Sequence, residues 1–273
     1  VQGGIQMFGK LIKYEFKALS SVLLPIFGAM LVMGILAPVF VSLPDITGGR
    51  FFIAQLLTVI YIVIYACLLF GGGLMCLIAT VIRFRKNLLG DEGYLMHTLP
   101  VKKWQLTASK VIAAVSMQLL GGLAAAVSGI IFIAMSVRSA FSGMVELFGL
   151  LHYLPDLGIF GTVTVIEVIV LALLALIGLN LMLYASLCVG YSANSHKTLL
   201  SIGAFIGFYI VSQIISGSAL KLAQVIFGDT LEFNTFTFAS MQPPILTAIL
   251  LYALYAAAYF VITSFFMKRK LNI

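Results

Sequence analysis

Charge is scarce in this chain of 273 residues. Only 9% of the residues are charged and 62% are hydrophobic, and the mean hydropathy is +1.15. A water-soluble domain carries about a quarter charged residues, so this composition excludes a soluble globular protein. Cysteine is also rare: Cys67, Cys76 and Cys188 lie inside apolar runs without a CxxC partner or a nearby histidine. That setting favours buried structural thiols over a disulfide or a metal site.

Sequence features of catalysis are missing as well. The chain has no GxxxxGK[ST] phosphate-binding motif, and the glycine run at 71–73 is followed by Leu74. The three histidines, His97, His152 and His196, are far apart in the sequence, and no HExxH motif is present. We therefore expect no catalytic residue, no metal site and no cofactor in this chain. A membrane-embedded enzyme would need a catalytic constellation within the bilayer, which the scattered histidines disfavour.

Long apolar runs dominate what remains. Six of them can hold the roughly 20 residues that cross a bilayer, and their continuous rather than alternating pattern predicts helices. The fold class is therefore predicted to be an all-α membrane protein with six transmembrane helices in one domain, 20–267, and a tail, 268–273. Residues 1–6 precede Met7 and are either an upstream start or a cloning remnant. The predicted spans are 20–41, 51–82, 111–137, 158–190, 199–217 and 245–267.

The basic residues predict the orientation. If the N-terminus lies inside, the outer connections hold only Arg50, Arg138 and Lys221, and the other 13 of the 16 lysines and arginines lie inside. Cytoplasmic connections carry such an excess, so both termini are predicted to be cytoplasmic. The net charge of +7 is thus a topology signal. A nucleic-acid partner is not expected, because no soluble basic domain is available to bind one.

The N-terminal segment 8–19 is predicted to be an amphipathic helix at the membrane surface. Its lysines face away from an apolar stripe, as in helices that lie in the headgroup layer. Glu15 interrupts this stripe, and a carboxylate in an apolar setting needs a partner. Arg83 and Arg85 are the candidates for a structural ion pair with Glu15. The stripe comprises Phe8, Leu11, Ile12, Phe16 and Leu19.

A polar stretch, 83–110, connects the second and third predicted spans. Gly90 permits a turn, acids follow where they favour a helix N-terminus, and Pro100 ends the segment. A short helix is predicted between them, and it would expose an apolar triplet, Tyr94–Met96. A topogenic loop needs no such triplet, so we favour a docking element over a solvated loop.

These residues resemble a known family. A six-span chain with "KLIKYEFKAL" near its start and "RFRKNLLGDEGYLMHTLPVKKWQLTASK" after its second span is similar to type-2 ABC transporter permeases of Gram-positive bacteria. The topological resemblance covers the whole chain and is sharpest at 83–110. Within the family, the chain is most similar to permeases of peptide-toxin exporters of the phenol-soluble-modulin type.

The resemblance implies an N-terminal elbow helix, six spans and a cytoplasmic coupling helix in a bacterial cell membrane. It also implies two permease copies, as a homodimer or pseudo-dimer, that bind separate ATPase subunits holding ATP and Mg. The coupling helix would sit in a groove of the ATPase, and the turn 191–198 would make a smaller contact. The implied docking residues are Asp91, Glu92, Tyr94, Leu95, Met96, His97, Thr98 and His196.

Polar side chains inside the spans offer candidates for a transport pathway. These polar side chains lie on two helical faces. The side chains of each face either form hydrogen bonds within the helix bundle or contact an amphipathic substrate. Glu167 lies near the outer end of its span, so a structural role is favoured over attraction of a cationic substrate. Gly203 and Gly207 predict close helix packing. The two faces are Gln55, Thr58, Tyr61 and Tyr65 in the second span, and Tyr209, Ser212, Gln213 and Ser216 in the fifth.

The preferred hypothesis is the membrane subunit of an ATP-driven exporter, whose substrate is an amphipathic peptide such as a toxin or antimicrobial. Composition does not distinguish a peptide from a drug or a lipid. A sensor or immunity protein that binds a peptide without moving it is the remaining alternative.

Overall fold

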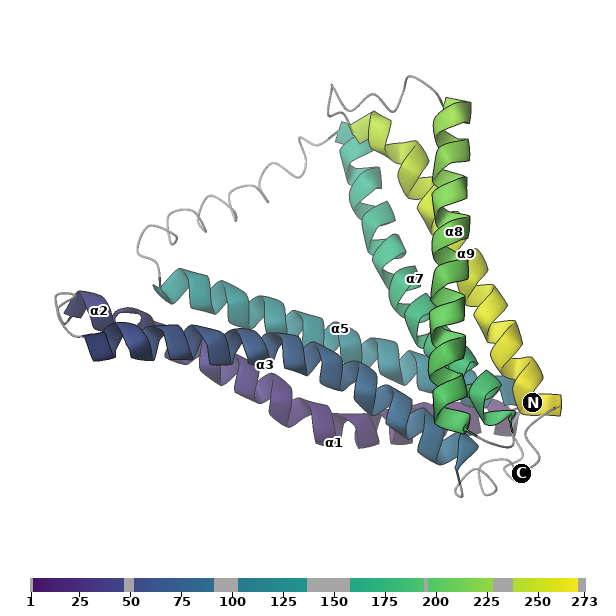
Figure 1. The fold of residues 1–273 in the computed structure, drawn as a ribbon, viewed down its shortest axis with the longest axis horizontal. Coiled ribbons are helices and arrows are strands. Elements are labelled where there is room, and N and C mark those ends of the chain that lie inside the picture. The colour runs from purple at the N-terminus through teal and green to yellow at the C-terminus, as the bar shows by residue number, and fades with distance from the viewer. Residues whose placement is uncertain are drawn as a thin grey trace. The chain divides into compact units, whose positions relative to one another are not determined.

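A computed structural model of the protein describes residues 2–46, 52–90, 103–136, 158–193, 196–227 and 238–269. Every regular element in these ranges is helical (Figure 1). The elements in chain order are α1 (Gln2–Val41), α2 (Leu43–Ile46), α3 (Phe52–Phe84), the π-helical turn η1 (Arg85–Leu89), α5 (Lys103–Ser136), α7 (Gly158–Tyr191), α8 (Lys197–Phe227) and α9 (Phe238–Arg269).

Six helices in the described ranges are long and apolar enough to cross a membrane, which supports a multi-pass membrane protein. Large apolar side chains are exposed along all of them, as expected where lipid replaces water as the solvent. For the described residues, the prediction of an all-helical chain with six helices able to span a membrane is confirmed. The spans are Met7–Val41, Phe52–Leu89, Trp104–Ile133, Gly161–Tyr191, Lys197–Ala223 and Gln242–Met267.

The helix ends extend beyond several of the predicted apolar runs. Helix α5 already begins at Lys103, α8 continues to Phe227, and α9 includes Pro243 and Pro244 near its start. These two prolines are the sixth and seventh residues of α9, so each removes an intrahelical hydrogen bond, which membrane helices tolerate when neighbouring groups satisfy the freed carbonyls. A prediction from apolar runs finds the part of a helix that crosses the lipid but omits the polar turns at its two ends.

The N-terminal amphipathic segment is not set apart from the first span. Helix α1 is continuous from Gln2 to Val41 and contains Pro25 and Pro38. The predicted interfacial helix 8–19 therefore continues directly into the first span, and a separate elbow is not seen. The predicted coupling helix, 91–98, lies outside the described residues.

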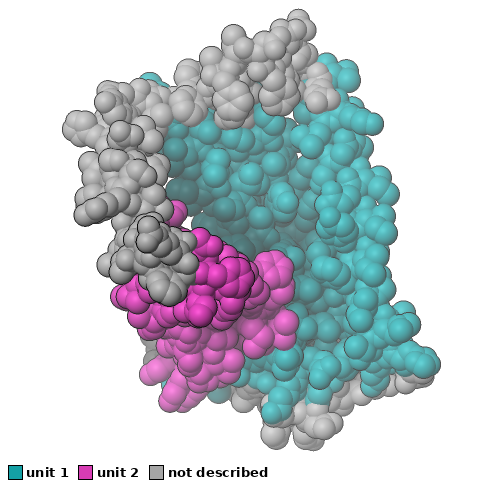
Figure 2. Space-filling model, turned by 60° about the vertical axis from the view of Figure 1, so that its left-hand side comes forward, with its two compact units in different colours: residues 1–12, 81–115, 154–273 teal, residues 13–80, 116–153 magenta. Residues whose placement is uncertain are grey.

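The chain divides into two compact units (Figure 2). Unit 1 contains residues 1–12, 81–115 and 154–273, and unit 2 contains residues 13–80 and 116–153. Each unit is described by itself below.

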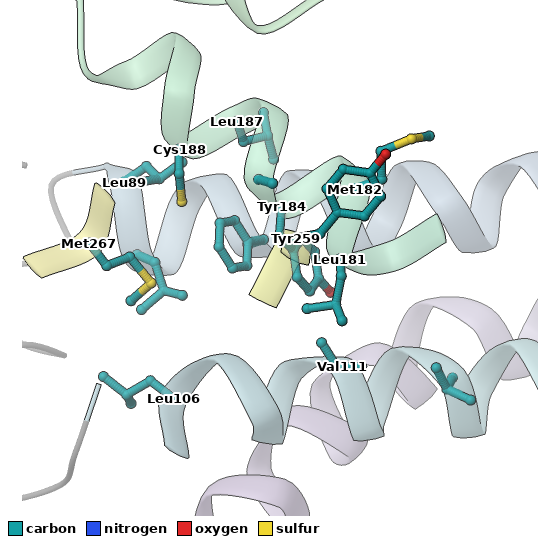
Figure 3. Close-up of a cluster of buried hydrophobic side chains, with 14 residues drawn as sticks. Leu89, Leu106, Val111, Leu181, Met182, Tyr184, Leu187, Cys188, Tyr259 and Met267 are labelled. Atoms are coloured by element: carbon teal, nitrogen blue, oxygen red, sulfur yellow. The ribbon is translucent and has the colours of Figure 1, made fainter. Parts of the chain in front are cut away.

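Unit 1 is built around α7, α8 and α9. Helix α8 runs antiparallel to α9, because Phe208 pairs with Tyr259 and Ser216 with Tyr255. Helices α7 and α9 begin at the same end, where Thr164 bonds Gln242. Buried side chains of α7 and α9 converge with those of the end of α3, η1 and the start of α5 in one apolar cluster (Figure 3), and partly buried side chains of α8 pack against it. At its centre the Phe84 and Tyr184 rings stack with centroids 4.0 Å apart.

Unit 2 packs α1, α3 and α5 through small residues. A Cβ atom on Gly34 would lie 2.7 Å from the backbone oxygen of Ser128, and one on Gly121 would lie 2.9 Å from the Phe27 ring. Lipid provides no hydrophobic force between helices, so close approach at small residues is a main source of their association. By contrast, a Cβ atom on Gly203 or Gly207 would meet nothing within 4 Å, so the close packing predicted at these two glycines is not present in the described chain.

Candidate functional site

A cavity of about 440 Å³ lies among α7, α8 and α9 of unit 1. Its volume falls within the range of small-molecule sites, roughly 300–1,000 Å³. No lining residue is charged. The lining residues are Ala175, Gly178, Leu179 and Met182 from α7, Phe205, Tyr209, Ser212, Gln213 and Ser216 from α8, and Tyr252, Tyr255 and Tyr259 from α9.

Tyr255 ties α8 to α9 across this cavity. Its hydroxyl donates to the Ser212 backbone oxygen at 3.0 Å and lies 2.9 Å from Ser216 Oγ. A phenol has one donor proton, so Ser216 is the donor in the second bond. About two turns of α9 present Tyr252, Tyr255 and Tyr259 to the cavity, and the ring centroids of neighbouring tyrosines lie 6.2 and 6.4 Å apart. The cavity therefore has an aromatic wall in which hydrogen bonds to α8 hold Tyr255 in place.

Other polar groups of the cavity remain open. Within the part of the chain that the structure describes, no hydrogen bond is made by the Gln213 amide or by the hydroxyls of Tyr209 and Tyr252. Gln213 is 16 residues from Lys197, about 24 Å along the helix at 1.5 Å per residue, and thus inside the span. Gln213 is exposed on the described chain, and an amide that faces lipid without a partner is unfavourable by several kcal/mol. These groups are therefore available to a ligand in the cavity.

The predicted polar face of the second span is arranged differently. Thr58 Oγ1 donates to the Phe40 backbone oxygen at 2.7 Å, and the Tyr61 hydroxyl donates to the Met33 backbone oxygen. Tyr65 bonds Ser128 Oγ at 2.7 Å, which in turn donates to the Met30 backbone oxygen at 2.6 Å. Phe132 stacks on Tyr65 with centroids 4.9 Å apart.

Both tyrosines of that face are buried, whereas Gln55 is exposed. Three of the four side chains are thus used to join helices within unit 2. This arrangement favours the packing interpretation for Thr58, Tyr61 and Tyr65, while the fifth span carries the open polar groups.

Glu167 belongs to a polar cluster at the start of α7 and α9. The Gln242 amide lies 2.8 Å from Thr164 Oγ1. When its nitrogen is turned toward Glu167, it donates to the two carboxylate oxygens at 2.9 and 3.1 Å and its oxygen accepts from Thr164. The surrounding hydrogen bonds decide between the two orientations of the amide. In this orientation Gln242, Glu167 and Thr164 all form hydrogen bonds. The cluster joins two helices, in agreement with a structural role.

The remaining predicted residues are less closely defined. The docking residues between Asp91 and Thr98 lie outside the described residues. His196 is exposed at the turn before α8 with a φ of 51°. Glu15 is buried, with 4% of its side chain exposed, and belongs to unit 2, whereas Arg83 and Arg85 belong to unit 1. The ion pair between them stays a prediction.

Sequence reasoning missed the contribution of α9 to the cavity. Tyr252, Tyr255 and Tyr259 recur at spacings of three and four residues, which places them on one helical face, so the signal was present. No family model, curated protein or solved structure matches the chain.

Proposed function

We propose that this protein is the membrane subunit of an ATP-driven exporter, with the cavity among α7, α8 and α9 as part of the route for an amphipathic substrate. The observation that carries the proposal is the uncharged, tyrosine-walled cavity with an open Gln213 amide inside a membrane helix. Tyrosine rings accommodate an apolar side of a substrate, and the amide and hydroxyls accommodate a polar side.

The energy source would be a separate ATPase subunit. The sequence carries no phosphate-binding motif, and the segment 91–98 has the apolar triplet of a docking helix. Two copies of the chain would bind two ATPase subunits, and nucleotide-driven movement of the docking segments would open the route alternately to the two sides of the membrane. Both termini and the basic helix ends would face the cytoplasm of a bacterial cell.

Isolation of the protein from native membranes tests this function. The expected result is that an ATPase subunit co-purifies with the chain and that an amphipathic peptide stimulates ATP hydrolysis. The double variant Tyr94→Ala, Leu95→Ala removes apolar contacts of the docking segment, so it is expected to insert normally and to lose ATPase association. Lys221→Ala, at an exposed site on α8, is the matched control.

Two outcomes would contradict the proposal. Full ATPase association of the Tyr94, Leu95 variant would show that docking lies elsewhere. Isolation without any ATPase, together with peptide binding, would support the sensor or immunity alternative, because such a protein binds a peptide without an energy source.

A further inference from the structure

A second cavity lies at the opposite end of unit 1 from Glu167. It is a crevice of about 260 Å³ between the end of α3, α7 and the beginning of α8. Its inner part is apolar, with Val81, Leu183 and Phe205 among the lining residues. Its outer part is formed where the helices end, by Arg85, Tyr191 and Thr198.

Positive charge gathers at the mouth of the crevice. Arg85 is exposed and begins η1, where the last turn of the second span widens into a π-helix, a feature frequent at functional sites. The Lys197 ammonium lies 5.8 Å from the centroid of the Tyr191 ring, within the range of a cation–π contact. None of the lining residues is acidic, and the described residues of unit 1 provide no ion pair for Arg85.

The hydroxyl protons of the two serines in the crevice are already used in hydrogen bonds to the backbone. Ser186 Oγ donates to the Leu183 backbone oxygen and Ser201 Oγ to the Lys197 backbone oxygen, each at 2.8 Å. The Thr198 hydroxyl makes no hydrogen bond among the described residues, and Thr198 and Arg85 both line the crevice. The crevice thus combines an apolar interior with a donor-rich, cationic mouth.

We propose that the crevice binds one anionic phospholipid, with an acyl chain against Leu183 and Phe205 and the phosphate at Arg85 and Thr198. Three observations select this occupant: the site is at the end of the spans where lysine and arginine gather, it opens at the level where apolar helix gives way to polar turn, and its charge is complementary to a phosphate. The inference uses the orientation proposed above only to assign the lipid to the cytoplasmic leaflet, and does not depend on transport.

Native mass spectrometry of the detergent-purified full chain tests the site. The probes are phosphatidylglycerol and phosphatidylcholine with identical acyl chains, so that only the headgroup charge differs. We expect tighter retention of phosphatidylglycerol, and a loss of about fivefold in that preference for Arg85→Gln, the ratio that corresponds to one basic residue beside an anionic surface. Lys13→Gln removes an exposed positive charge from α1 and is expected to leave the preference unchanged.

A second variant distinguishes a loss of lipid binding from a loss of folding. Thr198 is in the first turn of α8, where an acid favours the helix. Thr198→Asp is therefore expected to keep the unfolding temperature while repelling the phosphate and reducing phosphatidylglycerol binding by about fivefold. Arg85→Lys is expected to retain part of the preference, because a point charge remains but the bidentate geometry is lost.

Several results would overturn the proposal. Equal binding of the two lipids, or equal losses in Arg85→Gln and Lys13→Gln, would show that the crevice does not select an anionic headgroup. Displacement of phosphatidylglycerol by millimolar inorganic phosphate would identify a free-phosphate site instead. A change of oligomeric state or of ATPase association in Arg85→Gln, with lipid binding intact, would assign the crevice to a protein partner.

Discussion

Gln242 and Gln213 are both amides within membrane helices, but their surroundings differ. Gln242 lies between Thr164 and Glu167 at hydrogen-bond distances of 2.8 to 3.1 Å, whereas Gln213 faces a cavity without a partner among the described residues. A satisfied amide joins helices, and an open one must be met by a ligand, water or a second protein. The same residue type therefore has a structural role in one span and a candidate binding role in another.

Replacement of Glu167 tests the structural role. Glu167→Ala is expected to lower the stability of the purified protein by about 0.6–1.7 kcal/mol, the range for side-chain hydrogen bonds between membrane helices, because the Gln242 amide loses its acceptor. Glu167→Gln keeps an acceptor oxygen and is expected to lose less than half as much. Thermal unfolding in detergent measures both. A Glu167→Gln variant as unstable as Glu167→Ala, or one that abolishes transport of a cationic peptide alone, would indicate that the negative charge itself is required.

At the scale of the elements, the sequence predicted the presence and type of all six spans. In a chain with so little charge, a run of about 20 apolar residues is stable as a helix that crosses the membrane. The sequence did not predict which polar residues meet. Tyr61 and Gln213 looked equivalent as members of polar helical faces, yet Tyr61 donates to a neighbouring helix and Gln213 lines a cavity. That difference depends on which helices pack together, and the periodicity of one helix contains no information about its neighbours.

Glycine provides a second example. Gly203 and Gly207 have the spacing of a helix-packing motif, but the space around them is open in the described chain. Close approaches occur instead at other glycines, among them Gly34 and Gly121. Small-residue spacing predicts that a close approach is sterically possible, and the packing of the whole helix decides whether it occurs.

Alanine substitution in α1 tests this packing. Gly34→Ala would place a Cβ atom 2.7 Å from the Ser128 backbone oxygen, so the helices must separate. The expected loss of stability is about 1–3 kcal/mol, as for other overpacked sites. Gly28, on the same helix, has open space, and Gly28→Ala is the matched control with no expected loss. Equal unfolding temperatures for the two variants would show that α1 does not depend on the close approach at Gly34.

At the scale of the whole molecule, the two units perform different tasks in our account. Unit 1 holds both cavities and the tyrosine wall, whereas the polar side chains of Thr58, Tyr61 and Tyr65 in unit 2 are used in helix packing. The division depends on contacts between helices far apart in the chain, such as η1 with α7. It is therefore a property that apolar runs and charge counts did not reveal.

The central claim is that the cavity of unit 1 is part of an export route powered by a separate ATPase. Its most direct test is ATP-dependent accumulation of a labelled amphipathic peptide in inside-out vesicles that contain the chain and its ATPase partner. The account predicts accumulation with the unaltered protein and a decrease of about fivefold to tenfold for Gln213→Leu, the ratio for loss of about one hydrogen bond to the substrate, with basal ATP hydrolysis retained.

The matched control is Ser218→Ala on the same helix, whose hydroxyl donates to the Ile215 backbone oxygen outside the cavity, and it is expected to transport normally. Accumulation that is independent of ATP, or unchanged transport in Gln213→Leu, would contradict the account.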